Sequence, residues 1–218
     1  MASWDRKYLN QRLNDRAAKA LRLILNALLL SQLNQSISKC IFDNQLWNRI
    51  RILDSTSFQL PDSFADNYPG SGGSSNTAGV KIQLEYDLLS GKFLHVQSGE
   101  GSHNDKVYGS SCLEDIQDND LFLRDLGYFD LHDLNQIRKQ NAFFVSRIKL
   151  NIRVYIKNPT PETFANGTVK KQSEYTQIRL EKIMDRLEEA QTIEIPMVYC
   201  GMHQKLSARL ICYHLTDE

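Results

Sequence analysis

The chain has 218 residues, of which 41% are hydrophobic and 24% charged, and its formal net charge is zero. These values are typical of a soluble globular protein with one large domain or two small ones. The most apolar stretch, residues 17–33, is interrupted by Lys19, Arg22 and Asn26, which excludes a membrane span and indicates an amphipathic helix. Residues 1–16 are polar and charged, so no signal peptide is expected, and four cysteines without a CxxC pair favour a reducing cytoplasm.

The charge is unevenly distributed along the chain. Residues 1–52 carry nine Lys and Arg against three Asp, whereas residues 53–130 carry four Lys and Arg against thirteen Asp and Glu. A basic segment beside an acidic centre suits an enzyme that grips a phosphate backbone while carboxylates hold its metals. An ordinary solvated surface has the same pattern, so charge alone leaves both interpretations open.

The first half of the chain alternates helical and extended patterns. Apolar residues recur at spacings of three and four over residues 8–35, which predicts a helix that leads to a strand at residues 50–54. Residues 61–79 are rich in Gly and Ser and are expected to form a loop. The alternating runs at residues 80–87 and 93–97 flank Ser90-Gly91 and predict a β-hairpin.

The middle of the chain continues with helices between strands. Asn104 or Asp105 is expected to cap a helix that runs toward Leu113. A strand at residues 121–125, a helix at 131–140 and a strand at 142–148 follow. An order of strand, hairpin, helix, strand, helix, strand predicts an α/β fold with a mixed sheet covered by helices.

After Lys149 the pattern changes. Strands are expected at residues 151–157, 192–199 and 207–214, with a polar loop at 158–173 and a charged helix at 177–190. The chain is therefore divided into a helical N-terminal segment (residues 1–48), a mixed-sheet core (49–150) and a β-rich module (151–218).

Two aspartates follow apolar runs and are the candidate site. Asp54 lies on the strand face of Ile50 and Ile52, and Asp125 lies on that of Leu121 and Leu123. A carboxylate that continues an apolar face should sit at the edge of a core, where it needs a partner or a cation. Two such carboxylates could hold a divalent metal for phosphoryl transfer, although Asp is also a common turn residue.

The residues around these aspartates resemble those of a known family. Residues 52–61, 68–73 and 79–82 resemble the first catalytic block of bacterial insertion-sequence DDE transposases, with the insertion-sequence-four family as the closest group. Asp125-Leu126-Gly127-Tyr128 is similar to the second block, in which an Asp is followed at two and three residues by Gly and an aromatic residue. The order of elements is that of the ribonuclease-H-like fold, and the resemblance covers about residues 45–215.

The resemblance implies a ribonuclease-H-like mixed sheet with flanking helices, preceded by a helical segment and interrupted by the β-rich module. It implies a transposase that cleaves and transfers strands at transposon ends, with Asp54 and Asp125 as catalytic ligands of Mg²⁺ or Mn²⁺. The implied partner is double-stranded DNA, both transposon ends and target, bound by a homodimer in a synaptic complex. The implied location is the bacterial cytoplasm, in association with the nucleoid and not at a membrane. Candidate DNA contacts are Arg12, Arg16, Lys19 and Lys81.

In the family, a third carboxylate lies on a helix that reads Tyr, two residues, Arg, three residues, Glu, six residues, Lys. Here Tyr175 is followed by Ile178 and Lys182 where Arg and Glu should fall, and Tyr155 is followed by Asn158 where Arg should fall. The chain therefore resembles a catalytic-core fragment that lacks the third-carboxylate helix. We expect that this chain alone does not cut DNA, because Mg²⁺ tolerates poor coordination geometry badly.

Other interpretations remain open. A different ribonuclease-H-like nuclease would need a third acid within this chain, for which the candidates are Glu85, Asp87, Glu100, Asp105 and Asp130. A non-catalytic DNA-binding or interaction remnant would use the basic residues 6–22 as its contact surface. Cys200, His203, Cys212 and His214 could form a zinc site, although their spacing is unusual and Cys is commonly a small buried hydrophobe.

Overall fold

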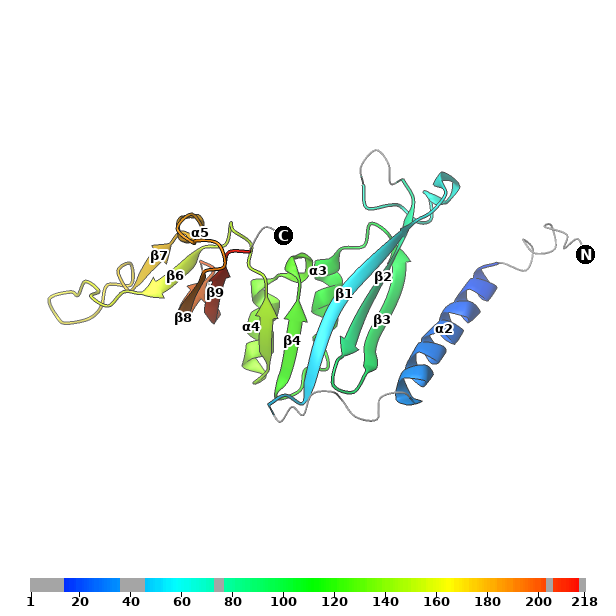
Figure 1. The fold of residues 1–218 in the computed structure, drawn as a ribbon, viewed down its shortest axis with the longest axis horizontal. Coiled ribbons are helices and arrows are strands. Elements are labelled where there is room, and N and C mark those ends of the chain that lie inside the picture. Colours follow the sequence, from blue (N-terminus) through cyan, green and yellow to red (C-terminus); the bar gives the residue numbers. More distant parts are fainter. Residues whose placement is uncertain (1–13, 36–45, 73–76, 203–205, 216–218) are drawn as a thin grey trace, which may run out of the picture.

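A computed structural model describes residues 14–35, 46–72, 77–202 and 206–215. Its centre is a five-stranded mixed sheet in the order β3-β2-β1-β4-β5, and a four-stranded sheet in the order β7-β6-β8-β9 follows it in the chain. Figure 1 shows the second sheet, coloured yellow to red, beyond α4 on one side of the molecule, and α2 beyond β3 on the other. The central strand order, with helices between the strands, is the ribonuclease-H-like arrangement that the sequence predicts.

The first three strands form the antiparallel part of the central sheet. β1 (Arg49–Gln59) pairs with β2 (Gly79–Asp87), and β2 pairs with β3 (Lys92–Glu100). The β2–β3 turn contains Gly91 at φ +70°, a conformation that glycine adopts without strain. The expected hairpin is therefore confirmed. β1 does not end at Asp54 as expected but continues to Gln59, because β2 provides an antiparallel partner up to Gly79.

The parallel part of the sheet consists of β1, β4 (Asp120–Arg124) and β5 (Phe143–Ser146). α3 (Asp105–Ser111) precedes β4, and α4 (Leu131–Lys139) connects β4 to β5. Asn104 caps α3 by accepting a hydrogen bond from the Lys106 amide. Asp130 caps α4, and Arg138 and Lys139 in its last turn complement the helix dipole. All these elements were expected.

The second sheet is built from β6 (Val154–Lys157), β7 (Tyr175–Ile178), β8 (Thr192–Cys200) and β9 (Leu206–Tyr213). The expected helix at residues 177–190 is wrong. β7 occupies its beginning and pairs with β6, and only α5 (Leu180–Met184) is α-helical. The extended pairing of Thr176 and Ile178 with β6 overrides the charged pattern that suggested a long helix.

One hydrophobic cluster joins the two sheets. It contains Phe122 of β4, Leu134 and Ile137 of α4, and the second-sheet residues Val154, Val198 and Leu206, all at most 2% exposed. The cluster crosses residue 150, where the sequence suggests a boundary between modules. The division of the chain at that residue stays a prediction.

α2 (Asp15–Gln35) lies beside β3 at the outer edge of the central sheet (Figure 1). The expected helix agrees with α2 where the structure describes it, and residues 8–13 lie outside the described part. Its apolar residues Leu21, Ile24, Leu25 and Leu28 are 48–56% exposed, so they are not part of the core. Within the described residues, none of the helices combines the length and hydropathy that crossing a bilayer requires.

Candidate active site

Asp54 and Asp125 occupy neighbouring positions on two adjacent parallel strands. The last residue pair between β1 and β4 is Leu53 with Arg124, and each aspartate is the next residue of its chain. Asp125 has extended dihedrals (φ −78°, ψ 173°), so the backbone continues in the strand direction. Because adjacent strands lie about 4.8 Å apart, the backbones of the two aspartates lie side by side. Leu53 and Arg124 are buried and both aspartates are exposed, as expected for side chains that share one face.

The two carboxylates make few contacts with the rest of the protein. Asp54 Oδ1 accepts a hydrogen bond of 2.8 Å from the backbone amide of Ser55. Asp125 Oδ1 lies 3.5 Å from the guanidinium of Arg147, and these side chains are 63% and 75% exposed. The sequence suggested a more enclosed position at the edge of a core. The buried face of β1 and β4 is instead the opposite one, which contains Arg51, Leu53, Phe122 and Arg124.

α3 packs against the residues that precede the two aspartates. Gly109 in α3 allows this close approach, because a Cβ there would lie 3.2 Å from the Tyr128 ring, 3.3 Å from Arg124 Nη1 and 3.7 Å from Leu53 Cδ2. Arg124 Nη2 donates a hydrogen bond of 2.9 Å to the Gly109 carbonyl oxygen. The helix therefore contacts both strands at the point where the candidate site begins.

A buried ionic network lies under the same part of the sheet. Arg51 is fully buried and donates to Glu85 at 2.6 and 3.1 Å, and to Asp115 at 2.8 Å. Asp120, also fully buried, accepts from Arg49 at 2.5 and 2.8 Å. Burial opposes the charge on Arg51, but the bonds to Glu85 and Asp115 outweigh it and raise the pKa of Arg51.

This network was not predicted from the sequence. The available signal is the alternation in Arg49-Ile50-Arg51-Ile52, which places two arginines on one strand face. It indicates that one face carries charge, but it does not show which face is covered by α3.

The other acidic candidates are buried or already have protein partners. Glu85 and Asp87 are buried on the network side of the sheet, and Asp130 caps α4 and pairs with Lys106 at 2.7 Å. Glu100 is hydrogen-bonded to Ser102, and Asp105 pairs with Lys81. Over the residues that the structure describes, no group of three or more His, Cys, Asp or Glu is positioned to hold a metal.

The candidate DNA contacts are not gathered in one place. Arg12 lies outside the described residues. Arg16 and Lys19 are on α2 and exposed, beside β3, which is separated from β1 by β2. Lys81 is on β2 and only 15% exposed, and its ammonium donates to the His103 carbonyl at 2.9 Å and to Asp105 at 3.0 Å.

The proposed zinc ligands are separated. Cys200 and Cys212 are buried free cysteines on different strands. They are not opposite each other, because Cys200 is paired with Leu206 and Cys212 with Ile193. Burial raises the pKa of Cys200 to about 11, which disfavours the thiolate that zinc requires. His203 lies outside the described residues.

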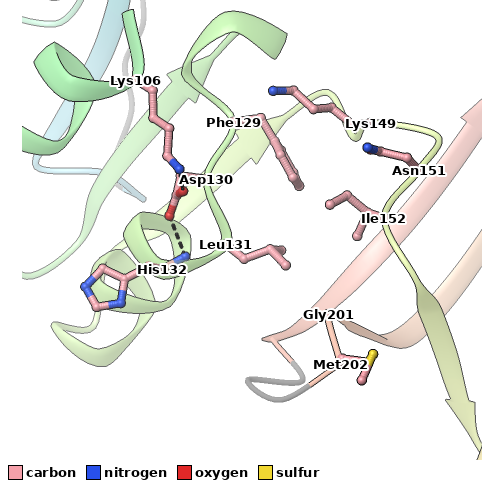
Figure 2. Close-up of a pocket in the computed structure, with 10 residues that line it drawn as sticks. All are labelled: Lys106, Phe129, Asp130, Leu131, His132, Lys149, Asn151, Ile152, Gly201 and Met202. Carbon is pink, nitrogen blue, oxygen red and sulfur yellow. Dashed lines mark hydrogen bonds and ion pairs between the residues drawn. The ribbon is translucent and has the colours of Figure 1, made fainter. Parts of the chain in front are cut away.

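A cavity of about 440 Å³ lies between the central sheet's helices and the second sheet. In Figure 2, Lys106 reaches toward Asp130, while Leu131 and Gly201 face each other from the two regions. A Cβ on Gly201 would lie only 2.7 Å from Leu131 Cδ1. The cavity is therefore bounded by the contact that joins α4 to the β8–β9 turn, and it contains neither Asp54 nor Asp125.

The chain matches a known domain family and several curated transposases. The family model "Transposase DDE domain" matches residues 48–206. The chain is 51% identical over 212 residues to the transposase for insertion sequence element IS231B of Bacillus thuringiensis subsp. berliner, and 37% identical over 210 residues to that for IS1151 of Clostridium perfringens. A solved piggyBac transposase synaptic complex with hairpin DNA is a remote likeness, with a TM-score of 0.39 and 11% identity over 95% of this chain and 40% of that one.

The chain therefore belongs to the transposase DDE domain family. Each of the two insertion-sequence alignments covers 96% of this chain and 44% of the relative. The chain thus spans less than half the length of these curated relatives.

Proposed function

We propose that this chain is part of an insertion-sequence transposase, of the insertion-sequence-four family, that cleaves and joins DNA strands at transposon ends. The observation that carries this proposal is the register of β1 and β4, which brings Asp54 and Asp125 to neighbouring positions on one face of a ribonuclease-H-like sheet. Membership of the transposase DDE domain family supports the same activity.

The donor set suits a divalent metal. Two exposed carboxylates provide oxygen ligands of the kind that Mg²⁺ and Mn²⁺ prefer, and their present contacts are one backbone amide and one exposed arginine. An exposed ion pair such as Asp125–Arg147 is worth at most about 1 kcal/mol, so it does not compete strongly with a cation. When bound, the metal would supply electrostatic stabilisation of the attacking and leaving oxygens of a phosphodiester.

The role of the protein in this proposal is to hold these ligands and the DNA. The double-stranded partner would be the transposon ends and the target, held by a homodimer, in the nucleoid-associated bacterial cytoplasm. Arg16 and Lys19 are exposed and free to contribute electrostatic contacts to phosphates. Lys81 would have to leave Asp105 before it could contact DNA.

Metal binding is the direct test of the two aspartates. Mn²⁺ titration of the 218-residue chain, followed by the electron paramagnetic resonance signal of the free ion, should reveal a site that Asp54→Ala and Asp125→Ala each weaken. Asp66→Ala, which removes an exposed carboxylate from the β1–β2 connection, is the matched control and should leave the affinity unchanged. Equal affinities for the chain and both site variants would refute the assignment.

The DNA partner is tested separately. Binding of a duplex transposon end should weaken steeply with salt, because neutralised phosphates release counterions. Arg16→Ala with Lys19→Ala should reduce the salt slope by about 2, since each phosphate contact contributes about 0.9. An unchanged slope would remove these residues from the DNA interface. Salt-dependent binding with no metal site would favour the non-catalytic interpretation.

A further inference from the structure

Asp105, the first residue of α3, lies at a junction of several polar side chains. Its Oδ1 accepts hydrogen bonds from Gln83 at 2.8 Å and Lys81 at 3.0 Å, and lies 3.5 Å from the Ser55 hydroxyl. The Asp105 side chain is 28% exposed and the Lys81 side chain 15%. Two residues of β2 therefore hold this carboxylate in one orientation.

The Asp105 side chain meets the chain just beyond each candidate metal ligand. Ser55 directly follows Asp54 on β1. Gly127 is two residues after Asp125, in the η2 turn (Leu126–Tyr128), and a Cβ there would lie 3.4 Å from Asp105 Oδ2 and 3.8 Å from its Cβ. One side chain thus lies against both segments that leave the candidate site.

Tyr128, the last residue of the η2 turn, also contacts α3. It is only 3% exposed, and its hydroxyl is buried. Its ring packs against Gly109 of α3. The η2 turn is therefore fixed to α3 at both Gly127 and Tyr128, and a shift of α3 would move the residues that follow Asp125.

From these contacts we infer that Asp105 is a positioning residue that sets the relative placement of the Asp54 and Asp125 carboxylates through Ser55 and the η2 turn. Asp105 is not itself a ligand, because Lys81 neutralises it and it contacts Ser55, which points to the opposite strand face from Asp54. This inference rests on the proposed metal site. Groups that orient metal ligands typically change metal affinity by about 10- to 100-fold when they are removed.

The test compares Mn²⁺ binding by the 218-residue chain and its variants. Asp105→Ala should weaken the affinity about tenfold. It should also raise the number of water molecules on the bound ion, measured by water-proton relaxation, because one carboxylate no longer reaches the metal. Asp105→Asn keeps the shape and an oxygen acceptor but loses the charge that holds Lys81, so its affinity should fall by less. Asp66→Ala is the matched control.

Each measurement is made well below the unfolding temperature of the variant, so that a loss of stability alone does not alter the binding result. A folded Asp105→Ala chain with wild-type affinity and hydration would overturn the inference. If Asp105→Ala does not fold, the Mn²⁺ affinity of Asp105→Asn is the test. A wild-type affinity for Asp105→Asn would then overturn the inference. Failure of Asp54→Ala and Asp125→Ala to weaken binding would instead refute the metal site itself, so the two failures are distinguishable.

Discussion

The two regions of the molecule share one apolar cluster but differ in their buried polar and charged groups. Under the central sheet the buried residues include many charged and polar groups: Arg51, Gln83, Glu85, Asp87, Asp120, Arg124 and Asp133. Under the second sheet the buried side chains are apolar, among them Val154, Leu180, Val198 and Leu206. Among the described residues, every buried charged side chain thus belongs to the region that contains the two candidate metal ligands.

This difference has a physical consequence. Apolar packing depends mainly on volume and tolerates rearrangement, whereas a buried ion pair requires its partners at defined distances. The ionic network connects β1, β2 and β4 through Arg51, Glu85 and Asp120, directly behind the strands that bear Asp54 and Asp125. We therefore expect the strand register of the central sheet to be more strongly defined than that of the second sheet. We also expect the loss of a single polar partner to destabilise the central region more.

The largest effect should follow from breaking the buried ion pair. Arg51→Met leaves Glu85 buried and without its main partner, so the free energy of unfolding should fall by about 3–5 kcal/mol. Denaturant titration measures this change. Arg209→Met removes the exposed partner of Glu194 in the second sheet and should cost less than about 1 kcal/mol. Similar losses for the two variants would contradict the contrast between the regions.

The next effect concerns the contact that joins the regions. Gly201 and Gly167 both have positive φ, +83° and +82°, but only Gly201 has a close neighbour, the Leu131 side chain. Alanine at either position should cost about 1–2 kcal/mol for the backbone conformation. Gly201→Ala should cost about 1–3 kcal/mol more because of the clash.

Thermal or denaturant unfolding of these two glycine variants measures the difference. Leu131→Ala, combined with Gly201→Ala, should recover part of the extra loss. Equal losses for Gly167→Ala and Gly201→Ala would mean that the turn does not pack on α4 in solution.

The smallest effect is a pH dependence at the edge of the ionic network. Burial opposes ionisation of Asp115, but Arg51, followed by His95 and Arg49, outweighs it and lowers the pKa of Asp115 below its ordinary 3.8. A carboxyl with a lowered folded pKa stabilises the protein above its unfolded pKa, and this contribution is lost as the pH falls through the folded value. The wild-type chain should therefore lose stability in acid more steeply than Asp115→Asn.

The comparison can be sharpened with a carboxyl whose pKa is shifted in the opposite direction. Burial raises the pKa of Asp133, so its contribution is present at low pH and lost as the pH rises through the folded pKa. Unfolding midpoints between about pH 2 and 6, measured for Asp115→Asn and Asp133→Asn, should diverge from wild type in opposite senses. Parallel curves for the two variants would contradict the assigned shifts.

Much of the fold was predictable from local patterns. The β2–β3 hairpin, the helices α3 and α4, the Asn104 cap of α3, and the strands β4, β5, β8 and β9 follow from alternation, helical spacing and one capping residue. The helix expected at residues 177–190 was wrong because pairing with β6 extends Tyr175–Ile178, and pairing depends on residues about twenty positions away. The end of β1 was misplaced for the same reason, since β2 determines it.

The sequence by itself determined most of the strands and that each aspartate follows an apolar run, because side-chain alternation is a local property of the backbone. Only the tertiary structure decided that Leu53 is paired with Arg124, that Arg51 is buried and that Asp105 lies against Ser55 of β1 and Gly127 of the η2 turn. These features depend on contacts between distant segments, where a shift of one residue would exchange the faces of a strand.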